Sequence, residues 1–170
     1  MSRVDRGYYF EHEIGIALDE LKKKRYGELF YYKMVDTHSY DKIYCPQCGH
    51  KFEIPLIIPK AIADYMVWTG NRTMYFIECK FTSNDTSFPL RNIADHQISF
   101  GLQASYYGWF YYFIIHISHS DFCYVIDIKS LDDIMAKLKD RKSIPYKYLD
   151  AMSVKIKKAG KIWDLSEVIK

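Results

Sequence analysis

Residues 62–81 read IADYMVWTGNRTMYFIECKF, and this stretch decides how the fold is interpreted. It contains two runs rich in aromatic and branched residues, at 62–69 and 73–81, which are separated by a Gly-Asn-Arg sequence. Such runs are typical of strands, and Gly and Asn suit a tight turn between them. The stretch therefore predicts two neighbouring strands that pair antiparallel.

The second run ends in an acid and a base, although its apolar residues indicate a strand that contacts the core. Because side chains alternate along a strand, Glu78 and Lys80 should project from one face and Cys79 from the other. Closing the hairpin also brings Asp64 within reach of Glu78 near its open end. Two carboxylates that lie so close repel each other unless one is protonated or a cation lies between them.

A hard divalent ion, Mg²⁺ or Mn²⁺, fits such a pair, because it binds carboxylate and carbonyl oxygens and keeps water ligands. We expect Asp64, Glu78 and the backbone carbonyl of Cys79 to bind this ion. Lys80 would orient an attacking water or stabilise negative charge, as metal-assisted phosphodiester hydrolysis requires. The alternative, from these residues alone, is an exposed Glu–Lys pair that contributes little to stability.

Hydrophobic periodicity elsewhere predicts one mixed α/β domain over residues 1–170, with a central sheet flanked by helices. The 170 residues are 49% hydrophobic and 26% charged, which suits a single packed core. Beyond the hairpin, the predicted elements are helices over 7–24, 92–108 and 130–138, the last capped by Ser130, and strands over 29–35, 110–118 and 122–128.

Charge and hydropathy limit the classes of partner. The apolar runs are too short for a signal peptide or a membrane span, so we expect no membrane association and a cytoplasmic location, in a bacterium or, for a viral protein, in the host cell. The net charge of +3 does not by itself require a polyanion. Basic residues nevertheless cluster at 22–25 and at 141–161, either as solvated faces or as a surface that binds phosphates.

Residues 36–60 show no clear period and are interpreted as an irregular insertion. Within it, Cys45 and Cys48 form a Cys-Pro-Gln-Cys pair that resembles half of a zinc ribbon. A closed Zn²⁺ site needs four ligands, and His38 and His50 are the nearest further ones. Two copies of a dimer could instead share one ion, or the cysteines could be free thiols in a metal-free turn.

Two motifs resemble a known group of enzymes. Asp64 followed by Glu78-Cys79-Lys80 resembles the catalytic core of the PD-(D/E)xK nuclease superfamily. The segment TSNDTSFPLRNIADHQIS at 82–99 is similar to the stretch after the Glu-x-Lys motif in the RecU family of Holliday junction resolvases. There, a T-S-F-P-L-x-N run is followed by H-Q-I. Short runs at 6–7, 10–11 and 141–144 resemble the same family, so the similarity covers most of the chain outside 36–60.

The resemblance implies a restriction-endonuclease-like core of order αβββαβ and a magnesium-dependent endonuclease of DNA recombination and repair. It would work as a homodimer and nick two strands of a four-way DNA junction symmetrically. The family carries a projecting stalk between its first and second strands, whereas here the Cys-containing insertion stands in its place, which puts junction selectivity in question. The alternatives are an endonuclease that acts on duplex or flap DNA and a non-catalytic DNA-binding module.

Further site residues follow from the same resemblance. Gln97 would be a polar group beside the metal and its water, next to the catalytic Lys80, although the residue alone indicates a helix cap or a surface amide. Glu11 matches an early Glu of the family, but Glu13 is so near that helix rotation decides which faces the site. The residues expected to contact DNA phosphates are Lys22, Lys23, Arg25, Arg91, Arg141, Lys142, Lys155, Lys157 and Lys158.

Overall fold

A seven-stranded mixed sheet forms the centre of the molecule. The computed structural model describes residues 3–34, 40–44, 48–55 and 60–170. Along the sheet the order is β1 (Leu29–Lys33), β4 (Tyr65–Thr69), β5 (Met74–Thr82), β7 (Phe110–Ile117), β8 (Phe122–Asp127), β10 (Val154–Ala159) and β11 (Ile162–Trp163). β5 and β7 are parallel, and all other neighbours are antiparallel. The predicted mixed sheet is confirmed.

Helices cover both faces of this sheet, so the predicted α/β sandwich is confirmed. On one face, α1 (Arg3–Lys24) buries Ile14 and Leu18 against Tyr65 and Ile77. The opposite face is covered by α2 (Asp95–Tyr106), α3 (Ile128–Lys137) and α4 (Tyr146–Met152). The elements α1, β1, β4, β5, α2 and β7 follow one another in the expected αβββαβ order once β2, β3 and β6 are set aside. No helix among the described residues has the length and apolarity to span a membrane.

The predicted hairpin is present as β4 and β5, with Tyr65 opposite Ile77 and Trp68 opposite Met74. Alternation along β5 divides its side chains between the two cores: Ile77 and Cys79 lie with α1, and Phe76 lies with α2. Glu78 and Lys80 share the parity of Phe76, so they project toward the α2 face, as the alternation predicted.

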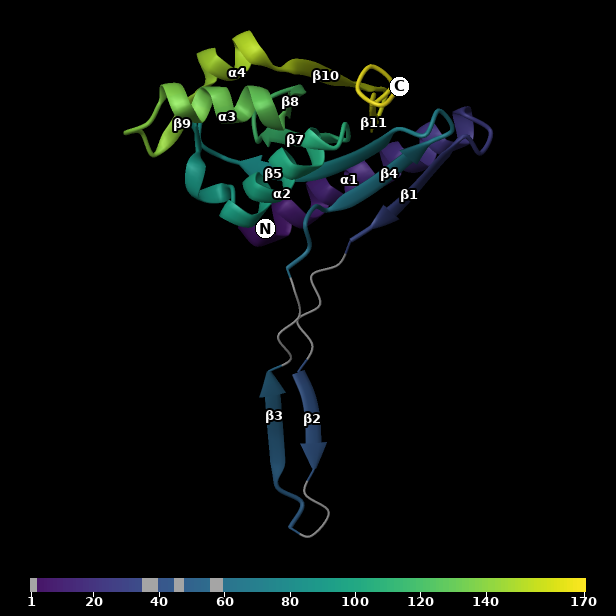
Figure 1. The fold of residues 1–170 in the computed structure, drawn as a ribbon, viewed down its shortest axis with the longest axis vertical. Coiled ribbons are helices and arrows are strands. Elements are labelled where there is room, and N and C mark those ends of the chain that lie inside the picture. Colours follow the sequence, from purple (N-terminus) through teal and green to yellow (C-terminus); the bar gives the residue numbers. More distant parts are fainter. Residues whose placement is uncertain (1–2, 35–39, 45–47, 56–59) are drawn as a thin grey trace.

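The prediction of an irregular insertion at 36–60 is wrong in part. β2 (Tyr40–Tyr44) and β3 (Lys51–Pro55) pair antiparallel with Tyr44 opposite Lys51, and Figure 1 shows this hairpin projecting away from the head between β1 and β4. A two-stranded ribbon outside a core imposes no strong apolar alternation on its sequence, so periodicity misses it.

Other differences lie in the second half of the chain. Asp127, not Ser130, caps α3, because its carboxylate accepts from the backbone N–H groups of Lys129 and Ser130. The Ser130 hydroxyl donates to Asp127 as well, at 2.6 Å. Elements that the sequence did not predict are β6 (Ser87–Pro89), which pairs with β9 (Ser143–Pro145), the 3₁₀ turn η1 (Leu90–Asn92), and α4, β10 and β11 after residue 145.

Candidate active site

Asp64 lies directly before β4 and is fixed by three hydrogen bonds. Its N–H donates to the carbonyl of Ile77 at 3.0 Å, and its carbonyl accepts from the N–H of Met34 at 2.8 Å. Its carboxylate Oδ2 accepts from the N–H of Cys79 at 2.6 Å. The main chain of β5 therefore holds the Asp64 carboxylate beside Glu78, as predicted. What the structure describes at Cys79 is this N–H contact, and the proposed role of its carbonyl remains a prediction.

Glu78 lies toward the end of β5 and is only 4% exposed. Its Oε1 accepts two hydrogen bonds, from Lys80 Nζ at 2.8 Å and from Gln97 Nε2 at 2.6 Å. Neither bond uses Oε2, so that oxygen can bind another group. Lys80 and Gln97, which the sequence assigned to the site on different grounds, both contact this one carboxylate.

Gln97 caps a helix and also contacts Glu78, while its predicted place beside a metal and its water stays a prediction. It lies in the first turn of α2, where its Oε1 accepts from the N–H of Ala94 at 3.0 Å and so caps the helix. Because the carbonyl end is bound to the backbone, the amide nitrogen must face Glu78. Gln97 reaches Glu78 because α2 packs closely against β7 and the start of α3. A Cβ on Gly101 would lie 2.9 Å from Ile128 and 3.1 Å from Tyr111.

The structure also shows which acid of α1 faces the site. Glu11 forms an ion pair with Lys33 at 2.9 Å, and its charge helps to raise the pKa values of Asp64 and Glu78. Glu13 points elsewhere and accepts from Lys158 Nζ and from the indole N–H of Trp163, both at 2.8 Å. Glu11 is therefore the acid near the two buried carboxylates.

Lys33 is the residue of this region that sequence reasoning missed. It ends β1 opposite Tyr65, the neighbour of Asp64. Glu11 raises its pKa, mainly by accepting its hydrogen bond, and the charge of Asp64 adds to this. Lys33 lies within the strand predicted at 29–35, which could have indicated that it faces the site. The pairing of this strand, β1, with β4 was not predicted, however.

Burial of the two carboxylates makes a cation favourable here. Burial, followed by the charge of Glu78, raises the pKa of Asp64 from 3.8 to about 8. Burial also raises the pKa of Glu78, although Lys80 and Gln97 oppose this effect. Within the described part of the chain, no group of three or more His, Cys, Asp or Glu could hold a metal. Two carboxylates completed by backbone oxygens and water suit Mg²⁺, which usually keeps several waters.

The basic residues expected to contact DNA fall into separate groups. Arg91 lies in η1, and Lys142 lies next to it because the carbonyl of Lys142 accepts from the N–H of Leu90 at 3.0 Å. Arg141 precedes Lys142 in the chain. Lys22 and Lys23 lie in the last turn of α1.

Several of these cations already have partners. Lys23 pairs with Glu20 at 2.6 Å, and Arg25 donates to the carbonyl of Ile169. Three lysines of β10 face acids: Lys155 pairs with Asp150, Lys157 with Asp121 and Lys158 with Glu13. The sequence thus overestimated the free positive charge of the run at 141–161, because Asp121 and Glu13 come from distant segments.

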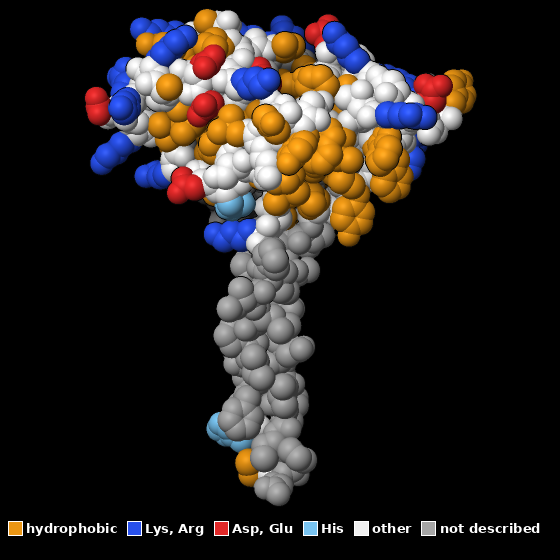
Figure 2. All heavy atoms as spheres, in the orientation of Figure 1, with side chains coloured by type: hydrophobic (Ala, Val, Ile, Leu, Met, Phe, Trp, Pro, Cys, Tyr) orange, Lys and Arg blue, Asp and Glu red, His pale blue; other side chains and the backbone are white. Residues whose placement is uncertain are grey.

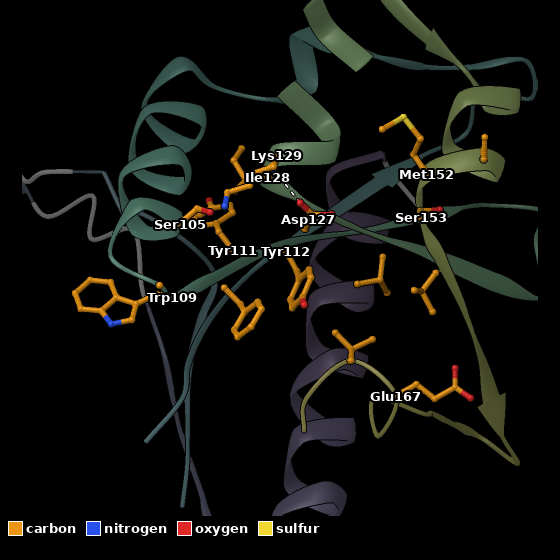
Figure 3. Close-up of a pocket in the computed structure, with 16 residues that line it drawn as sticks. Ser105, Trp109, Tyr111, Tyr112, Asp127, Ile128, Lys129, Met152, Ser153 and Glu167 are labelled. Carbon is orange, nitrogen blue, oxygen red and sulfur yellow. Dashed lines mark hydrogen bonds between the residues drawn. The ribbon is translucent and has the colours of Figure 1, made fainter. Parts of the chain in front are cut away.

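The zinc prediction lies partly outside the described residues, which do not include His38 and Cys45. Cys48 and His50 are described and exposed, near the turn between β2 and β3. A separate cavity of about 670 Å³ lies in the head, and Figure 3 shows the side chains that line it. Trp109, Tyr111 and Tyr112 line it, together with Asp127 and Met152, whereas Asp64, Glu78 and Lys80 do not.

The αβββαβ core, with Asp64, Glu78 and Lys80 at one end of neighbouring strands, defines an α/β protein of the restriction-endonuclease-like class. A sequence model of the family Recombination protein U, or RecU, matches residues 5–169, and the chain belongs to this family. The Holliday junction resolvase RecU of Shouchella clausii (strain KSM-K16) is 32% identical over 80 residues, which are 47% of this chain. The match spans 39% of that relative's length.

Among solved structures, Hjc of Archaeoglobus fulgidus, a Holliday junction resolvase from an archaeal hyperthermophile, aligns with a TM-score of 0.47 and 12% identity. The alignment covers 86% of this chain and 93% of Hjc.

Proposed function

We propose that the chain is a Mg²⁺-dependent endonuclease that resolves four-way DNA junctions by paired, symmetric nicks. The observation that carries the proposal is the convergence of Asp64, Glu78, Lys80 and Gln97, with two donors on Glu78 Oε1 and Asp64 bound to the next residue of the strand. Membership of the RecU family supports DNA junctions as the substrate.

Asp64 and Glu78 would hold the metal, with the Cys79 carbonyl as a further ligand. When bound, the cation would supply a water of lowered pKa and neutralise charge on the phosphate. Lys80, only 2.8 Å from Glu78, would donate to a phosphate oxygen and stabilise the charge that develops there. Gln97 would keep Glu78 in the orientation that presents Oε2, and Glu11 would act from the rim of the site.

Paired nicks require two sites with fixed relative direction, which a two-fold homodimer would supply. An aromatic face supports this assembly. On the side of the sheet away from α1, Phe30 pairs with Trp68, and both are about half exposed. Figure 2 shows hydrophobic side chains gathered on the head beside the root of the hairpin. A second copy would cover these rings, each of which offers about 150–250 Å² when fully buried.

DNA arms would lie along Arg91, Arg141 and Lys142, which are near one another in the fold. None of the three takes part in the ion pairs described above. The Cys48 end of the hairpin would bind Zn²⁺ together with Cys45 and His50. His38 is left out of this site, because β2 begins at Tyr40 and runs five residues before the turn that contains Cys48. Measuring the zinc content of purified protein and of Cys48→Ala tests this part, because equal content in the two would contradict it.

The experiment for the main proposal compares a labelled mobile four-way junction with a linear duplex of the same arms, in Mg²⁺. Native protein, Glu78→Gln and the exposed control Lys137→Ala are assayed together. Paired nicks on the junction that vanish only in Glu78→Gln are expected. Equal cutting of duplex and junction would remove junction selectivity, and binding without cleavage that depends on Glu78 would make the chain a DNA-binding module.

A further inference from the structure

Two tyrosines at the start of α1 are exposed although a helix of this kind usually presents polar side chains to water. Tyr8 is 62% and Tyr9 is 55% exposed, and their rings meet edge to face with centroids 6.1 Å apart. The next residue, Phe10, is 3% exposed and makes the core contact of this turn. The two rings therefore add little to the core and are available to a partner.

A short chain of contacts leads from these rings to the candidate active site. Lys33 Nζ lies 5.6 Å from the centroid of the Tyr8 ring and 2.9 Å from the Glu11 carboxylate. Lys33 is followed by Met34, whose N–H donates to the carbonyl of Asp64 at 2.8 Å. Figure 1 shows the N-terminal end of α1 beside the place where the hairpin leaves the head. The tyrosine pair thus borders the site.

We propose that Tyr8 and Tyr9 form a stacking platform for an unpaired nucleobase of the DNA, next to the bond that is cut. An exposed ring gains most from a flat, apolar partner, and every nucleobase has such a face. Inside a duplex the neighbouring base pairs cover these faces, so a base can stack on protein only where the helix is interrupted. At a branch point the stack is interrupted, so a base pair that ends there can open more easily and offer a base beside phosphates that the site can attack.

This inference rests on the proposed nuclease function and adds a source of selectivity to it. Two-fold symmetry selects a junction through the spacing of two sites. The tyrosine pair would instead distinguish a branch point from a duplex within a single subunit.

The test measures binding of a four-way junction and of a duplex in the Glu78→Gln background, which keeps the DNA uncut. Tyr8→Ala and Tyr9→Ala remove the rings, whereas Tyr8→Phe and Tyr9→Phe keep them. Tyr26→Ala is the matched control, because Tyr26 is 96% exposed and follows the other end of α1. A 2-aminopurine base at the branch point, or far out along an arm, reports stacking through its fluorescence.

We expect each Ala variant to bind the junction roughly 5- to 150-fold more weakly, the range that loss of one stacked base gives. Duplex affinity, the Phe variants and Tyr26→Ala should stay unchanged, and only the branch-point probe should brighten when the rings are removed. Unchanged junction binding by the Ala variants would overturn the inference, as would an equal loss on duplex. A changed oligomeric state would also overturn it, because the rings would then contact a second copy.

Binding by the Glu78→Gln protein with both tyrosines intact, called the parent here, distinguishes a failure of this inference from a failure of the proposed function. If the parent shows no preference for the junction, the proposed function has failed and the platform fails with it. If the parent prefers the junction and the Ala variants keep that preference, only the platform is wrong.

Discussion

Gln97 bridges the N-terminus of α2 and the strand β5: its Oε1 accepts from the N–H of Ala94 at 3.0 Å while its Nε2 donates to Glu78 at 2.6 Å. The amide therefore couples the position of α2 to the orientation of a buried carboxylate. Few other side chains can make both bonds at once, because the residue must accept at one end and donate at the other.

Replacing Gln97 with Ala should lower cleavage about 10- to 100-fold, as is usual when a residue that orients a metal ligand is lost. Loss of the cap should also reduce the free energy of unfolding by about 1 kcal/mol. Single-turnover cleavage and thermal unfolding measure the two effects. Gln103→Ala, an exposed change on the same helix, is the control, and equal cleavage by both variants would contradict the role given to Gln97.

Replacing Lys80 with Ala should reduce cleavage by about 10²- to 10³-fold, since one donor that stabilises developing charge is typically worth that much. Junction binding should change little, because many other contacts bind the backbone. Cleavage and binding are measured side by side, with Lys137→Ala as an exposed control. A loss of binding as large as the loss of cleavage would place Lys80 in DNA affinity rather than in chemistry.

Gly15→Ala should destabilise the fold, because its Cβ would lie 2.8 Å from the hydroxyl oxygen of Tyr65. That hydroxyl donates to the carbonyl of Glu11 at 2.9 Å, so the clash also disturbs the turn that carries Glu11. We expect a loss of about 1–3 kcal/mol in denaturant unfolding. Gly7→Ala on the same helix has no atom within 4 Å of the new Cβ and should stabilise by about 0.5–1 kcal/mol. Equal effects at both positions would refute the close approach.

The stability of the metal-free protein should fall as pH rises from about 4 to about 8. Folding raises the pKa of Asp64 from 3.8 to about 8, so the folded state binds this proton more tightly and loses that advantage as the proton leaves. A tenfold change in proton affinity corresponds to about 1.4 kcal/mol, so the change amounts to a few kcal/mol. Unfolding in EDTA across this range measures it. The slope should flatten in Asp64→Asn, and adding Mg²⁺ should stabilise the native protein most at the high end.

Trp68→Glu should weaken self-association by placing a charge on the aromatic face. Burying an unpaired carboxylate in an interface costs several kcal/mol, so the dimer dissociation constant should rise at least 10²-fold. Sedimentation velocity across a concentration series measures this. Tyr26→Glu introduces the same charge at a 96% exposed position and should leave association unchanged. A native protein that stays monomeric at every concentration would refute the dimer itself.

Local patterns in the sequence predicted the parts of the site that lie on one hairpin. Alternation along 73–81 placed Glu78 and Lys80 on one face, and the turn residues brought Asp64 to Glu78. Glu11 and Glu13 could not be separated in this way, because rotation of α1 about its axis is decided by packing against the whole sheet. The position of Lys33 depended on the pairing of β1 with β4, a contact between distant segments.

The cap of α3 and the ion pairs of β10 also depend on features that local sequence patterns do not contain. Asp127 ends β8 and caps α3 at once, and a pattern of apolar residues does not say where a strand stops and a helix begins. The lysines of β10 were expected on a solvated or phosphate-binding face, and the ion pair of Lys158 was missed because Glu13 lies 145 residues away in the chain.

The N–H of Met34, which precedes the hairpin, donates to the carbonyl of Asp64, which follows it. The two segments of chain therefore meet where the hairpin joins the head. The hairpin of β2 and β3 is therefore attached to the head at one place, whereas Ile62 and Ala63 pack in the core and belong to the head. Exchanging residues 36–59 for a short turn should preserve the site, because Ile62 and Ala63 keep their core contacts, while the choice of DNA shape should change. We therefore expect that substrate preference and bond cleavage can be altered separately.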